Sequence, residues 1–254
     1  MDNSTVRPSS HRDRTLTNRQ LLDSNGHATL FAMQLAMVSC LVLTLLSVAV
    51  IDRPVADYAH AVLRAHEKDV YGPLTHIVDP IPVIAGLTTG AYALAALFGI
   101  RPSARGWTAL RIALAVLVAF ALKDQLKFVM GRTWPETWTN NNPSYIKDGV
   151  FGFFPTISWG NAGRAYHSFP SGHMTMISVA SVSLALTFPR WRWFAILPIA
   201  LVAIGLAGAN YHWISDMIAG TFLGSAVAVA AHRLGRYAQE FEATQERSGR
   251  DRGP

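Results

Sequence analysis

The chain has 254 residues, of which 50% are hydrophobic and 15% are charged, with one cysteine and a net charge of +6. Soluble domains carry about 25% charged residues, so this composition favours a membrane protein. The single cysteine, Cys40, excludes a disulfide within the chain. The basic residues lie between apolar runs rather than in one stripe, so the positive charge does not indicate nucleic acid binding.

Six apolar runs are each long enough to cross a bilayer, which requires about 20 mostly apolar residues. The first run is too long for the apolar core of a signal peptide, so it predicts a retained helix. The sequence therefore predicts an all-α, polytopic membrane protein with six transmembrane helices. These helices are expected at residues 29–51, 79–100, 108–130, 171–189, 193–212 and 214–232, and a tight turn joins the last two.

Lysine and arginine residues predict the orientation of these helices. If both termini are cytoplasmic, most of the 22 Lys and Arg residues fall on the cytoplasmic side. This arrangement predicts polar cytoplasmic tails at 1–28 and 236–254 around a six-span domain of residues 29–235. Two segments then lie outside. Residues 52–78 have the spacing of an amphipathic surface helix, and residues 131–170 form a long loop rich in aromatic residues.

Three polar segments lie at the predicted outer ends of the helices. The first contains Lys123 and Lys127, which share a helix face, followed by Arg132. Charged side chains at the end of a membrane helix often extend to the interface for solvation alone. That structural interpretation applies to each of the three segments and is the favoured one for the first segment by itself.

The second segment is Pro-Ser-Gly-His at residues 170–173. Ser171 is typical of a helix N-cap, and the backbone amides of a first helical turn favour a phosphate or another anion. Gly172 permits close approach of a ligand to the backbone, and His173 falls in the first turn. A lone histidine there is usually structural, but Ser-Gly-His facing a basic cluster favours an anion site.

The third segment contains His212 and Asp216. If the helix is continuous, the two share one face, and the carboxylate can fix the imidazole tautomer. The other ring nitrogen then serves as a nucleophile or base. Because the predicted topology puts all three segments on the outer side, cations, oriented amides and two histidines are expected to meet there. That set fits phosphoryl transfer.

These residues resemble the motifs of the type 2 phosphatidic acid phosphatase superfamily, which consists of six-span lipid phosphatases. Residues 170–173 match the whole middle motif, and His212 and Asp216 match the end of the last one. The resemblance covers residues 79–232. Two arginines of the family pattern are absent, because Trp134 and Leu206 stand in their places.

The resemblance implies a mechanism that needs no metal and no cofactor. His212 would be the nucleophile that forms a phosphohistidine, Asp216 would orient it, and His173 would be the general acid. The candidate phosphate-binding residues are Lys127, Ser171 and Gly172, together with Arg132, Arg164 and Lys123 as possible replacements for the absent arginines.

The residues and the resemblance together predict an integral membrane lipid phosphatase of a bacterial plasma membrane, with its site facing the periplasm or exterior. The expected partner is a lipid phosphate within the membrane, and no nucleic acid. Undecaprenyl pyrophosphate, phosphatidylglycerol phosphate, phosphatidate and lipid A all fit. The alternatives are a phosphotransferase with the same intermediate, a degenerate phospholipid-binding protein, and a transporter, for which paired interrupted helices are missing.

Overall fold

The structure, a computed structural model, describes residues 31–138, 141–155 and 163–250. It divides into two compact units, residues 1–39 and 40–254. The described part of the first unit is helical, and the tail predicted at 1–28 lies outside the described residues. Within the described residues there is no β-strand, only three isolated bridges. The all-α prediction is confirmed.

Each predicted span coincides with a helix. The helices are residues 31–46 followed by η1 (Ser47–Ile51), α4 (Pro80–Leu97), α5 (Ala104–Met130), α8 (Gly172–Thr187), α9 (Arg192–Gly208) and α10 (Ile214–Arg250). Four helical segments of the described chain are long and apolar enough to cross a membrane: Phe31–His66, Asp69–Leu97, Pro189–Gly208 and Ile214–Phe241. Since α8 has only 16 residues, the count of six spans and the sidedness of the termini stay predictions.

The last helix extends well beyond the predicted end of the sixth span at residue 232. α10 continues to Arg250, so residues 236–250, which the sequence suggested were a separate polar tail, prolong this helix. The sequence there is rich in Ala, Glu, Gln and Arg, which are strong helix formers, and it contains no proline. The helix therefore continues where the sequence changes from apolar to polar residues, and the composition does not mark its end.

Residues 52–78 are helical, as predicted, but the helix is broken into short pieces. These are α2 (Asp52–Tyr58), η2 (Ala59–Leu63), η3 (Arg64–His66), η4 (Glu67–Tyr71), α3 (Gly72–Thr75) and η5 (His76–Val78). The pieces η4 and α3 pack against α9. Gly205 permits that approach, because a Cβ atom there would lie 2.8 Å from Cβ of Leu74.

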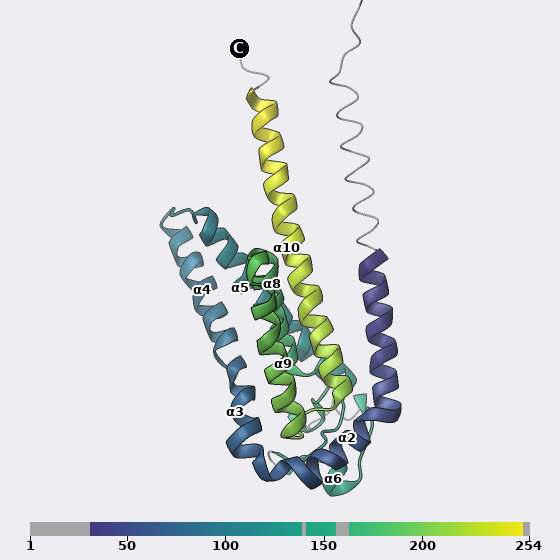
Figure 1. Ribbon diagram of the computed structural model, residues 1–254. Helices are drawn as coiled ribbons and strands as arrows, with labels where there is room; N and C mark the ends of the chain where they lie inside the picture. Colours follow the sequence, from purple (N-terminus) through teal and green to yellow (C-terminus); the bar gives the residue numbers. More distant parts are fainter. Residues whose placement is uncertain (1–30, 139–140, 156–162, 251–254) are drawn as a thin grey trace, which may run out of the picture. The chain divides into compact units, whose positions relative to one another are not determined.

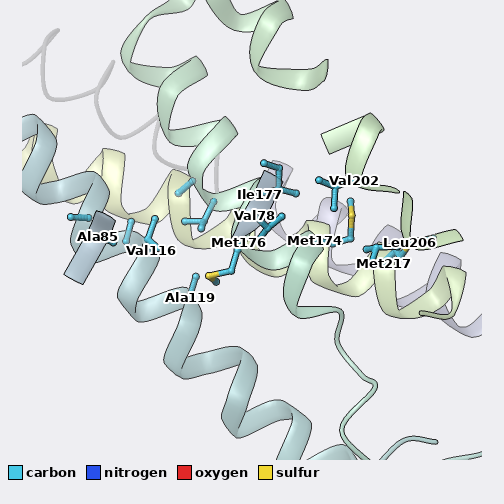
Figure 2. Close-up of a cluster of buried hydrophobic side chains, with 14 residues drawn as sticks. Val78, Ala85, Val116, Ala119, Met174, Met176, Ile177, Val202, Leu206 and Met217 are labelled. Carbon is cyan, nitrogen blue, oxygen red and sulfur yellow. The ribbon is translucent and has the colours of Figure 1, made fainter. Parts of the chain in front are cut away.

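The buried apolar core lies between α5, α8, α9 and α10, and α8 makes its most extensive contacts with α10 (Figure 1). Figure 2 shows Met174 and Ile177 of α8 among side chains from the other three helices, such as Val116, Leu206 and Met217. Side chains on the outer faces of the helices are largely apolar and exposed, which suits contact with lipid. α8 therefore packs against α5, α9 and α10, whereas α4 packs mainly against α5.

Small residues allow α8 and α10 to approach closely. A Cβ atom at Gly224 would collide with the carbonyl oxygen of Thr175 and lie 2.8 Å from the backbone nitrogen of Val179. Because backbone cannot yield as a flexible side chain does, we expect Gly224→Ala to destabilise the protein by about 1–3 kcal/mol. Thermal unfolding in detergent would measure this. Gly86→Ala is the matched control, since a Cβ atom at Gly86 has nothing within 4 Å, and an equal fall in both variants would contradict the packing account.

The long loop after α5 is folded over the end of the bundle rather than extended. It contains α6 (Tyr145–Asp148) and η6 (Gly163–Tyr166), and bridges pair Arg132 with Phe153 and His167. Its aromatic side chains, which the sequence suggested line the membrane interface, pack partly on one another and on the turn between α9 and α10. The Phe151 ring, for example, lies 4.9 Å from that of Trp213, while Trp159 lies outside the described residues.

Candidate active site

The three polar segments predicted to meet do lie together at one end of the bundle. α5 ends at Met130 and is capped by Gly131, whose positive φ of 57° suits a glycine. α8 begins beside it, since a Cβ atom at Gly172 would lie 3.3 Å from Cδ of Lys123 and 3.7 Å from Cε of Lys127. The backbone N–H of Ser171 donates to the carbonyl oxygen of Asp216, at 3.0 Å. The predicted convergence is therefore present in the fold, whichever side of the membrane this end faces.

His212 and Asp216 are in contact, but not for the reason the sequence suggested. α9 ends at Gly208 and α10 begins at Ile214, so His212 lies in the turn rather than on a continuous helix. Asn210, with φ of 56°, reverses the chain there. Asp216 lies in the first turn of α10, where its Oδ2 accepts from the N–H of Trp213, at 3.3 Å, and approaches Nδ1 of His212 at 3.2 Å. Asp216 therefore caps the start of α10 through the Trp213 N–H, and the same oxygen faces His212.

The arrangement around His212 leaves one of its ring nitrogens unused by Asp216. Both side chains are buried, and Oδ2 of Asp216 also accepts from the hydroxyl of Ser168. With Nδ1 directed at the carboxylate, Nε2 is the nitrogen available for chemistry. Burial is the main cause that lowers the pKa of His212, and Lys127 and Arg132 lower it further, against an opposing contribution from Asp216. A neutral imidazole at neutral pH follows from that direction.

The remaining predicted histidine and an indole lie beside His212. The ring centres of His173 and His212 are 6.2 Å apart, and that of Trp134 is 5.0 Å from His212. His173 follows the Ser171 cap, whose hydroxyl accepts from the N–H of Met174 at 3.4 Å. Two imidazoles and the first amides of α8 therefore border the same space.

The two lysines differ in their surroundings. The ammonium of Lys127 donates to the carbonyl oxygens of His167 and Ser168 and lies 5.4 Å from the ring centre of Trp134. The ammonium of Lys123 instead lies 2.5 Å from Oδ1 of Asp124 and 3.8 Å from the ring centre of Phe120. Lys127 is thus held at the loop that borders His212, whereas Lys123 is paired on α5.

Arg132, one expected replacement for an absent arginine, is completely buried and pairs with carboxylates. Its Nη1 lies 2.6 Å from Oδ1 of Asp216, and its Nη2 lies 2.6 Å from Oδ2 of Asp52. Nη1 also donates to the hydroxyl of Ser215. This geometry favours a role behind Asp216 over direct phosphate binding, because both terminal nitrogens already have anionic partners. The side chain of Arg164, the other candidate, lies outside the described residues.

Leu206 and Trp134 show what replaced the two family arginines. Leu206 is fully buried in the apolar core, so no charge is possible at that position without disrupting the packing. Trp134 instead borders His212 and Lys127. The site therefore has an indole where the family pattern has a guanidinium.

Sequence reasoning missed several residues that contact the predicted ones: Asp52, Ser168, Ser215 and Trp134. Asp52 had a readable signal, because an acidic residue directly after an apolar run is costly to bury without a partner. Ser168, two residues before Pro170, had no comparable signal. Among the described residues, no group of three or more His, Cys, Asp or Glu side chains could hold a metal ion.

The profile of the PAP2 superfamily matches residues 108–240, which include Lys127, residues 170–173, His212 and Asp216. The chain belongs to the PAP2 superfamily. Its helical fold and the order of its motifs agree with that membership. The segment with Asp52 lies outside the matched region.

Curated relatives in the superfamily are phosphatases. The chain is 31% identical over 115 residues to an undecaprenyl-diphosphatase of Sulfolobus acidocaldarius, covering 45% of this chain and 48% of that protein. It is 29% identical over 119 residues to a lipid A 1-phosphatase of Rhizobium johnstonii, covering 47% and 44%. The match thus spans about half the length of these relatives.

A solved PAP2 structure shares the fold. The crystal structure of a transmembrane PAP2-type phosphatidylglycerolphosphate phosphatase from Bacillus subtilis matches with a TM-score of 0.52 and 19% identity. The match covers 79% of this chain and 96% of that chain. At this identity the likeness establishes the fold alone.

Proposed function

We propose that this PAP2 protein is an integral membrane lipid phosphatase that works through a phosphohistidine. The observation that supports this most is the buried His212–Asp216 pair, with Nδ1 and Oδ2 at 3.2 Å, beside His173 and the start of α8. A carboxylate on one imidazole nitrogen makes the other a directed nucleophile. The named activities of the relatives, all removal of phosphate from a lipid, agree with the proposal.

In the first step, Nε2 of His212 attacks phosphorus and the bond from phosphorus to the lipid oxygen breaks. His173 gives a proton to that oxygen, so the lipid leaves as a neutral alcohol, or as a monophosphate from a diphosphate. In the second step, water attacks the phosphohistidine and His173 takes its proton. The bond from phosphorus to nitrogen breaks, and inorganic phosphate leaves.

Phosphate binding is assigned to the groups that border this space. The first amides of α8, at Gly172 and His173, suit the oxygens of a phosphate, because a helix start is an anion site. Lys127 adds a cation at the edge of the site. We leave Lys123, Arg132 and Arg164 out of this contact set. Lys123 and Arg132 are paired with carboxylates, and the side chain of Arg164 lies outside the described residues.

The proposed substrate is a lipid phosphate or diphosphate of the cell envelope, taken from the membrane by a site at the outer membrane–water interface. The named activities of the relatives define the first panel of substrates: undecaprenyl diphosphate, a lipid A and phosphatidylglycerol phosphate, with phosphatidate added. Release of inorganic phosphate by the purified protein, with EDTA present, tests the proposal. Phosphate passing to a second lipid instead would indicate a phosphotransferase. No turnover of any lipid would favour the degenerate binding protein.

The role of His173 as general acid predicts a dependence on the leaving group. We expect His173→Ala to lower kcat/KM on phosphatidate, which reports only the step that releases the leaving group, by about 100- to 10,000-fold, because the departing alkoxide then has no proton donor. p-Nitrophenyl phosphate has a leaving group that needs no protonation, so the activity of His173→Ala on this substrate should fall much less. Steady-state assays of both substrates measure the difference. Equal losses on the two substrates would contradict the general acid role.

A further inference from the structure

Asp52 lies behind the proposed site, although it comes from the start of α2, far from the motifs in sequence. Its carboxylate lies 2.6 Å from Nη2 of Arg132, 3.0 Å from the N–H of Ser215 and 3.1 Å from the hydroxyl of Ser47. The hydroxyl of Ser215 also donates to it, at 2.5 Å. Four donors thus hold one carboxylate that is 1% exposed.

Arg132 joins Asp52 to the carboxylate that faces His212. Its Nη1 binds Oδ1 of Asp216, whereas Oδ2 of Asp216 faces Nδ1 of His212 and accepts from Ser168. The two oxygens of Asp216 therefore have separate partners. If Arg132 turned to bind both oxygens side by side, as its fork allows, it would compete with His212 for Oδ2. Asp52 prevents this by occupying Nη2.

Stability alone does not explain a buried group of three charges. Removing charges from water costs so much that apolar replacements of buried ion pairs are often equally stable or more stable. The guanidinium carbon of Arg132 lies 4.8 Å from the ring centre of Phe153 and 5.3 Å from that of Trp213, so the surroundings are apolar and charge effects are strong. Asp52, Arg132 and Asp216 together carry one net negative charge.

We propose that Asp52 and Arg132 are positioning residues for His212: they hold Oδ2 of Asp216 on Nδ1 and keep a net negative charge behind the ring. This inference rests on the proposed function, because the charge matters when phosphorylation of Nε2 makes the ring cationic. A buried carboxylate group stabilises such a cation, as an aspartate does for an imidazolium in catalytic triads. The Asp52 end of the network lies outside the region matched by the superfamily.

The test variant is Asp52→Asn, which keeps the shape and an oxygen for the Ser215 N–H but removes the charge. Asp57→Asn is the matched control, since Asp57 is an exposed aspartate on the same helix, with a hydrogen bond from the Tyr145 hydroxyl. With dioctanoyl phosphatidate as substrate, we expect kcat of Asp52→Asn to fall by about 10- to 100-fold. The KM of Asp52→Asn should stay near the wild-type value, because Asp52 is not assigned a contact with substrate.

A titration separates positioning from simple structural support. Charged or titratable groups face His212 from several elements: Lys127, Arg132, His173 and Asp216, with Asp52 behind Arg132. Removing the charge of Asp52 makes the imidazolium less favourable, so the pKa of His212 should fall further. The acidic limb of kcat/KM should then move to lower pH. NMR titration of histidine-labelled protein in detergent, with the His212 signal assigned from His212→Gln, measures the same pKa without turnover.

Arg132→Lys is the second variant, because it keeps the charge and loses the fork that bridges two carboxylates. It should lower kcat by a similar factor and leave the pKa of His212 closer to the wild-type value. An unchanged kcat and His212 pKa in Asp52→Asn would overturn the inference, as would a rise in KM alone or a lower Tm alone. If the wild type released phosphate from no lipid, the proposed function would fail, and the NMR titration would still decide whether Asp52 acts on His212.

Discussion

His212→Ala should release no measurable phosphate from any lipid that the wild-type protein hydrolyses. Without the imidazole, no group remains to form the covalent intermediate, so the loss should be roughly a million-fold, as when a catalytic nucleophile is removed from other hydrolases. Phosphate release in detergent, with matched protein amounts and with EDTA, measures this. His232→Ala is the control, because His232 lies on α10 in a different cluster that includes Arg111.

The Tm of both variants decides how a loss is interpreted. If His212→Ala unfolds at the same temperature as His232→Ala and is inactive, the loss is chemical. Residual activity above about one per cent in His212→Ala would contradict a nucleophilic role, because removing a nucleophile leaves far less than that.

Asp216→Asn should lower kcat by about 1,000- to 10,000-fold. The amide cannot stabilise the cationic ring, and its NH₂ group can hold the wrong tautomer of His212. It also leaves Arg132 with only one carboxylate. Ser168→Ala is a useful comparison, since it removes one donor to Oδ2 and keeps the carboxylate. We expect its loss to be about tenfold, measured by the same phosphate assay. A loss in Asp216→Asn no larger than in Ser168→Ala would contradict the role of the carboxylate charge.

The helices and their meeting point could be predicted from the sequence because the signals are local. Long apolar runs define the helices, and Ser171 and Gly131 are residues typical of a helix start and a helix end. Alternation of direction between successive helices then puts Lys127, Ser171 and His212 at one end. The sidedness of that end rests on charge counting alone and stays a prediction.

The partners of the charged residues could not be predicted, because they depend on contacts between distant segments. Asp52 and Arg132 are 80 residues apart, and Arg132 and Asp216 are 84 apart. The sequence shows three ionisable residues near helix ends but not that they bind one another. The sequence alone therefore predicts that Arg132 binds phosphate, whereas in the structure both of its terminal nitrogens bind carboxylates. The packing of the long loop after α5 places Arg132 between the two carboxylates.

The His212–Asp216 contact was expected from helical spacing and arises from a different local structure. A spacing of four is compatible with both a helix face and a turn that is capped by the later residue. Asn210 at positive φ and the Trp213 N–H on Asp216 select the turn. The replacement of two family arginines by Trp134 and Leu206 could be read directly from the sequence. Their surroundings could not be predicted: Trp134 lies beside His212, and Leu206 lies in the apolar core.

The proposed function depends on a phosphohistidine at His212, and this intermediate can be trapped. Purified protein would be mixed with ³²P-labelled phosphatidate, quenched in alkali within the first turnover, and digested for peptide mapping. We expect label on the peptide that contains His212, stable to alkali and lost in acid, and no label in His212→Ala. Release of phosphate by a wild-type protein that never becomes labelled, or label that persists in His212→Ala, would contradict it.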